Sequence, residues 1–343
     1  MPEIASTIPD LWFERLANRF NLPIWGAAIV FGLGPFILLG AASSPIPGGL
    51  LNPPANAVSF DFLENALATG LLVTVISLFT FYTGRYLRRE ITGLLDYANS
   101  LTDRPAQETS SLRLSNLTST SGVMIAFAIT GSFTIPLFIL GGTGTLSENF
   151  AGEIPFIWFT FILASFFWVF GYSMYAIYRM GKLPLNLNPY SQDRTLGLRP
   201  FAKASLNSTL IYLGVTTTVI VPIAIGGAIP FELALLFLGL YPVGFVLFLL
   251  PLRSLGAKLR EARGDALAKI APRYERLVVD VSNGGKVDTE LANEMAVVAE
   301  VRHDLQQIRT WPFDTGILVR LLAIVISVSA ILVSALIRDF LHI

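Results

Sequence analysis

The sequence of 343 residues contains no cysteine and only two histidines. Without cysteine, the chain has no disulfide bonds, no thiolate metal sites and no cysteine nucleophile. His303 and His342 are the only imidazoles, which excludes the multi-histidine sites of most zinc and copper proteins. We therefore predict neither a metal site nor any other cofactor.

Charged residues are also scarce, making up 14% of the chain, against about 25% in a typical soluble domain. Lys and Arg number 24, and so do Asp and Glu, so the chain lacks the basic excess with which proteins bind nucleic acid. Hydrophobic residues make up 53%, and the mean hydropathy is +0.62. This excess of apolar surface predicts an integral membrane protein whose main partner is the lipid bilayer.

Seven stretches are long and apolar enough to cross a membrane, which takes about 20 helical residues. They lie near 24–42, 62–84, 122–140, 154–178, 206–229, 230–251 and 316–337. We therefore predict an all-α, multi-pass protein of the cell membrane with seven transmembrane helices.

The basic residues indicate the orientation of these spans. Of the 24 Lys and Arg residues, 23 fall on one side of the predicted membrane, and only Arg338 falls on the other. Loops 43–61 and 141–153 contain neither Lys nor Arg. Because basic loops stay in the cytoplasm, the N-terminus is predicted inside and the C-terminus outside.

The chain is predicted to divide into three parts. Residues 1–252 form a six-helix transmembrane bundle that begins with a short interfacial helix, in which Glu14 belongs to the polar face. Residues 253–312 are charged and helix-periodic, with a reversal near Asn283, and are predicted to form a cytoplasmic helical hairpin. Residues 313–343 form the seventh transmembrane helix.

The second arm of this hairpin carries a narrow apolar seam. Its members are Val298, Val301, Leu305 and Ile308. Such a seam is covered either by the first arm or by another subunit, and the two interpretations are compatible. The arm ends at Trp311 and Pro312, where proline stops the helix and tryptophan suits the membrane interface. The last membrane helix is expected to restart at Asp314 or Thr315.

The last span has a small and polar face, on which Arg320, Ser327 and Ser334 recur every seven residues. This face either lines an aqueous pathway at a symmetry axis or is the packing side of a buried helix. The fourth span is instead rich in rings, including Trp158, Phe161, Trp168 and Tyr172. These rings either face lipid or line a pocket for a small-molecule ligand.

Several function classes lack the residues that they require. There is no Gly-rich phosphate-binding loop followed by Lys-Ser or Lys-Thr, which argues against a motor or an ATPase. No predicted span contains a lysine for a retinal Schiff base or a mid-membrane carboxylate for ion coupling. No basic or nucleophilic residue accompanies Asp193 at a spacing typical of a catalytic site. We therefore predict no enzymatic activity. A passive pore needs only hydroxyls, carbonyls and apolar gates.

The predicted topology resembles that of insect odorant and gustatory receptors and their distant relatives. The shared features are seven spans, an internal N-terminus, and a final cytoplasmic helix separated from the last membrane helix at 310–314. The resemblance covers nearly the whole chain and implies a tetrameric ligand-gated cation channel, with cytoplasmic helices as the subunit anchor. Segments 190–200 and 310–314 are also similar to features of uncharacterised prokaryotic membrane proteins. The leading hypothesis is a homo-oligomeric channel, with a tetramer favoured; the alternative is a passive transporter or a non-conducting membrane scaffold.

Overall fold

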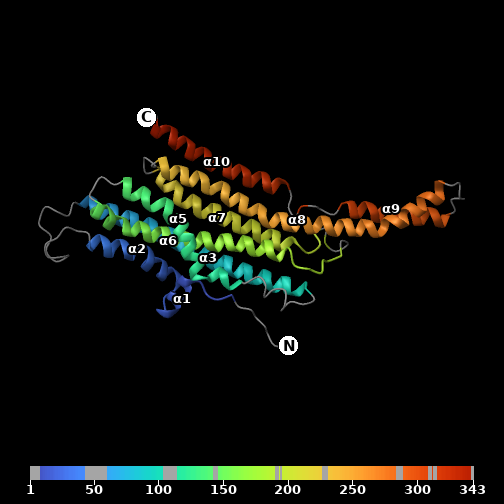
Figure 1. Ribbon diagram of the computed structural model, residues 1–343, viewed down its shortest axis with the longest axis horizontal. Coiled ribbons are helices and arrows are strands. Elements are labelled where there is room, and N and C mark those ends of the chain that lie inside the picture. Colours follow the sequence, from blue (N-terminus) through green and yellow to red (C-terminus); the bar gives the residue numbers. More distant parts are fainter. Residues whose placement is uncertain are drawn as a thin grey trace.

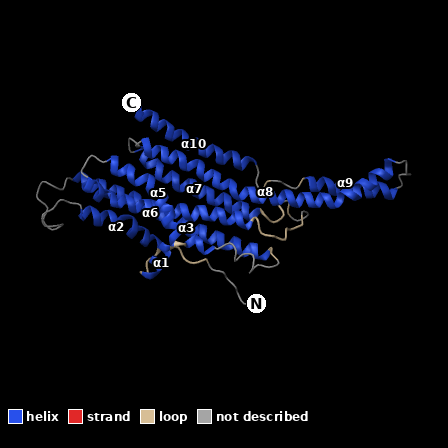
Figure 2. Ribbon diagram, viewed as in Figure 1, coloured by secondary structure: helices blue, strands red, loops and turns tan. Residues whose placement is uncertain are grey.

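The structure is a computed structural model of the chain. It describes residues 8–42, 60–102, 114–141, 146–189, 193, 195–225, 231–282, 289–307, 311 and 315–340. Within these ranges the chain consists of helices and short connections, without a strand (Figure 2). The predicted all-α class is confirmed for this part of the chain.

The helices follow the hydrophobic runs of the sequence. They are α1 (Trp12–Arg19), α2 (Ile24–Ala42), α3 (Phe60–Ser100), the short 3-10 helix η1 (Leu114–Thr118), α5 (Thr120–Gly141), α6 (Leu146–Met180), α7 (Arg199–Ile225), α8 (Phe231–Ser282), α9 (Thr289–Gln306) and α10 (Thr315–Phe340). Each of the seven predicted spans overlaps a separate helix.

Three of these helices are long and apolar enough to cross a membrane within their described residues. The qualifying segments are Gly70–Ser100, Ile157–Met180 and Pro242–Ser282. Shorter apolar segments occur in α2, α5 and α10, at Ile24–Pro35, Thr120–Ser132 and Val319–Ala330. The architecture is that of a helical protein that associates with a membrane.

Helix α6 lies at the centre of the bundle and packs against α2, α3, α5, α7 and α8 (Figure 1). Its Phe170 ring stacks on Tyr212 of α7, with the ring centroids 4.4 Å apart. The Tyr212 hydroxyl donates a hydrogen bond to the Leu240 carbonyl of α8 at 2.7 Å. A Cβ at Gly244 would lie 2.1 Å from the Tyr212 ring, so only glycine lets α8 approach α7 this closely.

Helix α8 runs without interruption from the bundle into the projecting hairpin (Figure 1). Its 52 residues correspond to a length of about 78 Å at 1.5 Å per residue. The predicted boundary at 252–253 therefore lies inside one helix, and Pro251 and Pro272 are both accommodated within it. Helix α9 returns along α8, and an ion pair joins the two arms between Arg273 and Glu294.

Candidate functional site

The first candidate feature is the outward face of α10, which lies along the edge of the bundle against α8 and α7 (Figure 1). Leu321 and Val328 are buried, with exposed fractions of 2% and 8%, and they form the packing side of the helix. Arg320, Ser327 and Ser334 are exposed. The polar face is therefore not the packing side of α10 within one chain.

The exposed surface of α10 is not uniform. At 100° per residue, Ser327 and Ser334 lie within about 40° of Arg320 around the helix. Ile326 and Val333 lie about 100° from Ser327 and Ser334, on a separate apolar strip. Ile326 and Val333 are exposed as well. Helix α10 thus has three sides: one that packs inside the chain, one that is apolar, and one that is small and polar.

The seam on the second arm of the hairpin is largely covered within the chain. Val298 and Leu305 are buried in α9, which packs against α8, and Val301 is half-buried. Ile308 lies outside the described residues. The outer side of α9 exposes Val297 instead, at 58%. The two arms therefore cover each other, as one of the two interpretations of the seam required.

Helices α9 and α10 are separate, since α9 ends at Gln306 and α10 begins at Thr315. Trp311, in the connection between them, is exposed. Pro312 and Asp314 lie outside the described residues.

The four ring residues of the predicted ligand pocket fall into two separate clusters. Trp158 and Phe161 stack on each other and surround Trp12 of α1, with the three ring centroids 5.2 to 6.2 Å apart. The Trp158 indole N–H donates to the Phe31 carbonyl of α2 at 2.7 Å. The Trp12 indole N–H donates to the Ser165 hydroxyl at 2.9 Å. These rings join α6 to α1 and α2.

Trp168 and Tyr172 lie further along α6, with their ring centroids 5.8 Å apart. The Trp168 indole N–H donates to the Asn116 carbonyl of η1 at 3.0 Å. A Cβ at Gly122 would lie 2.1 Å from the Trp168 ring, so α5 must present a glycine there. The structure thus places the second pair of rings at contacts with α5 and η1, away from the first pair.

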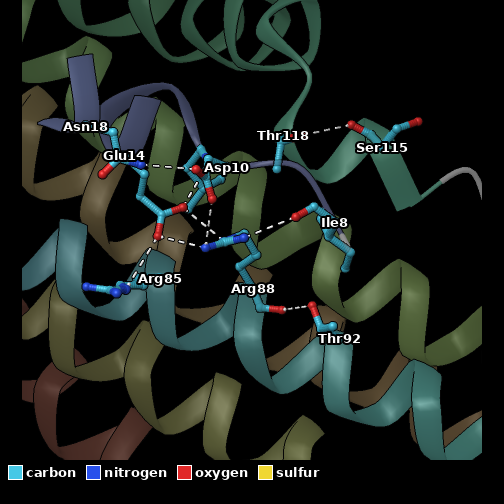
Figure 3. A network of polar contacts seen from close by, with 10 residues as sticks. Ile8, Asp10, Glu14, Asn18, Arg85, Arg88, Thr92, Ser115 and Thr118 are labelled. Atoms are coloured by element: carbon cyan, nitrogen blue, oxygen red, sulfur yellow. Dashed lines mark hydrogen bonds and ion pairs between the residues drawn. The ribbon is translucent and has the colours of Figure 1, made fainter. Parts of the chain in front are cut away.

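A cluster of charged residues that the sequence did not single out joins α1 to α3 (Figure 3). The Glu14 carboxylate is buried, with an exposed fraction of 4% for the residue. One of its oxygens lies 2.9 Å from Arg88 Nε, and the other lies 3.6 Å from Arg85 Nε. Arg88 also lies 3.1 Å from an Asp10 oxygen and donates to the Ile8 carbonyl at 3.1 Å.

This cluster changes the interpretation of the N-terminal helix. The sequence predicts Glu14 on the polar face of an interfacial helix, but its carboxylate points into the bundle and accepts a hydrogen bond from the Leu11 N–H at 2.9 Å. On the same helix, Phe13 stacks on Phe81 of α3, with the centroids 4.3 Å apart. Helix α1 is therefore docked by a buried ion pair and a ring stack.

Asp193 organises a turn between α6 and α7. Its oxygens accept hydrogen bonds from the Thr195 N–H and hydroxyl and from the Gly197 N–H, at 2.7 to 2.9 Å. Burial acts to raise the pKa of the Asp193 carboxyl, but these hydrogen bonds and the charge of Arg199 outweigh it, and the pKa lies below its usual value. Tyr97 of α3 donates to the Gly197 carbonyl at 2.9 Å and ties the turn to the bundle. The role of Asp193 visible here is to hold this turn.

Three features stand out: the polar face of α10, the ion-pair cluster between α1 and α3, and the projecting hairpin. Among the described residues, no group of three or more His, Asp or Glu side chains is arranged to hold a metal ion.

The chain matches no protein-family model, and neither the curated proteins nor the solved structures include one that matches it.

Proposed function

We propose that this protein is a subunit of a homo-oligomeric channel of the cell membrane, in which the α10 helices of four copies surround a central pore. Each subunit crosses the membrane seven times, with its N-terminus inside. One observation carries the proposal: Arg320, Ser327 and Ser334 face outward from a peripheral helix that packs through a different side, at Leu321 and Val328.

The energetics of a polar face in a membrane support this arrangement. Hydroxyls gain nothing from lipid tails, and an arginine facing lipid must extend to the headgroups, as Arg320 can from its place near the inner end of the span. Around a shared axis the same residues face water. Ser327 and Ser334 are then stacked about 10.5 Å apart along the pore, at 1.5 Å per residue. Among the described residues Arg320 forms no ion pair, and Asp314 lies outside them; a ring of arginines at the inner mouth favours anions unless Asp314 neutralises it.

Cysteine accessibility tests the proposal directly, because the native chain contains no thiol. We expect Ser327→Cys and Ser334→Cys to react with a charged, membrane-impermeant thiol reagent and to change anion flux through reconstituted liposomes. The matched controls are Ile326→Cys and Val333→Cys, which are exposed at the same depth on the apolar side of α10. The controls should remain unmodified, since they face lipid.

A non-conducting scaffold that acts through its cytoplasmic hairpin is the second candidate. The observation in its favour is the length of the hairpin, which projects well beyond the bundle (Figure 1). If the thiol reagent modified none of the four cysteines and no ion crossed the liposomes, the channel proposal would be refuted and the scaffold proposal would remain. A monomer in mild detergent would refute the channel as well, because one copy cannot surround an axis.

A further inference from the structure

The hairpin contains a half-open cavity between its two arms, which shares no residue with the polar face of α10 or with the apolar seam of α9. Its volume is about 430 Å³, within the range of about 300–1,000 Å³ typical of small-molecule sites. Leu267, Ile270 and Ala271 of α8 form an apolar wall. Tyr274 and Glu275 of α8, with Arg302 and Gln306 of α9, supply the polar part of the lining. The cavity thus combines an apolar surface with one charge of each sign.

The two charges of the cavity are not neutralised by each other. The Arg302 guanidinium lies over the Tyr274 ring, 4.4 Å from its centroid, which fixes its position without satisfying its hydrogen-bond donors. Within the described part of the hairpin, neither Arg302 nor Glu275 forms an ion pair. The nearby Arg273 and Glu294, in contrast, pair at 2.6 Å. Glu275, Arg302 and Gln306 are all exposed, so their polar groups are open to a ligand from solvent.

We propose that this cavity binds a small zwitterion with an apolar body, of the class of free α-amino acids with large apolar side chains. The carboxylate of the ligand is bound by Arg302 and the Gln306 amide, and its ammonium is bound by Glu275. Its side chain lies on the wall formed by Leu267 and Ile270. The cavity is in the predicted cytoplasmic part of the protein, where such solutes are present.

The charge arrangement distinguishes this ligand class from simpler amphiphiles. A carboxylate without an ammonium group is attracted by Arg302 but repelled by Glu275. An amine without a carboxylate is attracted by Glu275 but repelled by Arg302. A zwitterion satisfies both groups at once. Binding is therefore expected to need both charges of the ligand as well as its apolar side chain.

Saturation-transfer NMR on the full-length protein in detergent micelles tests this inference, with L-phenylalanine, L-leucine and L-tryptophan as probes and empty micelles as the blank. At least one amino acid should receive saturation, most strongly at its side-chain protons. We expect 3-phenylpropanoate and 2-phenylethylamine, which each lack one charge, to bind at least 10-fold more weakly than L-phenylalanine. The measurement does not depend on ion flux, so its outcome is separate from that of the channel proposal.

Variants of the chain assign the binding to the cavity. Arg302→Gln and Glu275→Gln should each weaken binding at least 10-fold. Lys269→Gln and Asp280→Asn are the matched controls, because both are exposed on the same arm and do not line the cavity, and they should leave binding unchanged. Helix content and elution volume should stay constant in all four variants. Absence of saturation with all three amino acids at millimolar concentration, or binding that survives both cavity substitutions, overturns the inference.

Discussion

The buried ion pair between Glu14 and Arg88 makes a quantitative prediction about the docking of α1. We consider Glu14→Gln, which keeps the shape of the side chain and removes its charge. Breaking a buried pair by removing one partner costs about 3–5 kcal/mol. The lower end applies here, because Arg88 keeps the Ile8 carbonyl and Asp10 as partners. The substitution should therefore destabilise the docked state of α1 by about 3 kcal/mol.

The assay is the labelling rate of a single cysteine introduced at Ala17, a buried position on α1 with an exposed fraction of 2%. The thiol reacts only when α1 leaves the bundle, so the rate reports the population of the undocked state. At about 1.4 kcal/mol per factor of ten, a loss of about 3 kcal/mol predicts labelling that is about 150-fold faster.

The matched control is Asp10→Asn. Asp10 contacts the same arginine through the same type of group, but its side chain is 41% exposed, against 5% for Glu14. Exposed pairs contribute about 0.2–1 kcal/mol, so labelling should rise no more than about five-fold. If Glu14→Gln and Asp10→Asn accelerated labelling equally, burial of the Glu14 carboxylate would not be what docks α1, and the reasoning would be refuted.

Two further predictions concern other contacts. At Gly32, a Cβ would lie 2.5 Å from the Thr74 Cα, so Gly32→Ala should separate α2 from α3, cost about 1–3 kcal/mol and lower the thermal midpoint in detergent. Gly34→Ala, with nothing within 4 Å, should leave the midpoint unchanged or raise it, and an equal loss in both variants would contradict the packing argument. The pKa of Asp193 is lowered in the fold, so its charge stabilises the turn above about pH 4, and this contribution is lost as the pH falls through the folded pKa. Asp193→Asn should therefore lose less thermal stability than the native chain between pH 5 and pH 3, and equal losses in the two proteins would contradict this account of the turn.

The hydrophobic runs of the sequence predict a helix at each of the seven spans, but not how far the helices continue beyond them: α3 extends to Ser100 and α8 to Ser282. The division between bundle and hairpin, predicted after Leu252, falls inside α8, which continues through Pro251 and Pro272. Proline removes one backbone hydrogen bond, and a helix supported by neighbours tolerates this loss. Whether a proline breaks a helix is therefore decided by the packing around it, which local sequence does not contain.

Two further features, the charged cluster between α1 and α3 and the direction in which the polar face of α10 points, could not be predicted without the tertiary structure. Glu14 and Arg88 are separated by 74 residues, and nothing near either one indicates that a carboxylate is buried. The only indication in the sequence is the spacing of the charges. Asp10 and Glu14 are four residues apart, and Arg85 and Arg88 are three apart on α3, so each pair presents its two charges on one side and the two pairs can meet. For α10, periodicity placed Arg320, Ser327 and Ser334 on one face, but a period alone does not say whether that face points into the bundle or away from it.

The continuity of α8 makes it a mechanical lever. Thirty residues separate Leu252 from Ser282, an arm of about 45 Å at 1.5 Å per residue, so a tilt of about 5° moves the tip by about 4 Å. At the base of this arm α8 packs closely on the end of α6, since a Cβ at Gly181 would lie 2.6 Å from the Ser254 hydroxyl. Helix α8 also packs against α10, so a rigid-body tilt of α8 would displace the helix that carries the polar face.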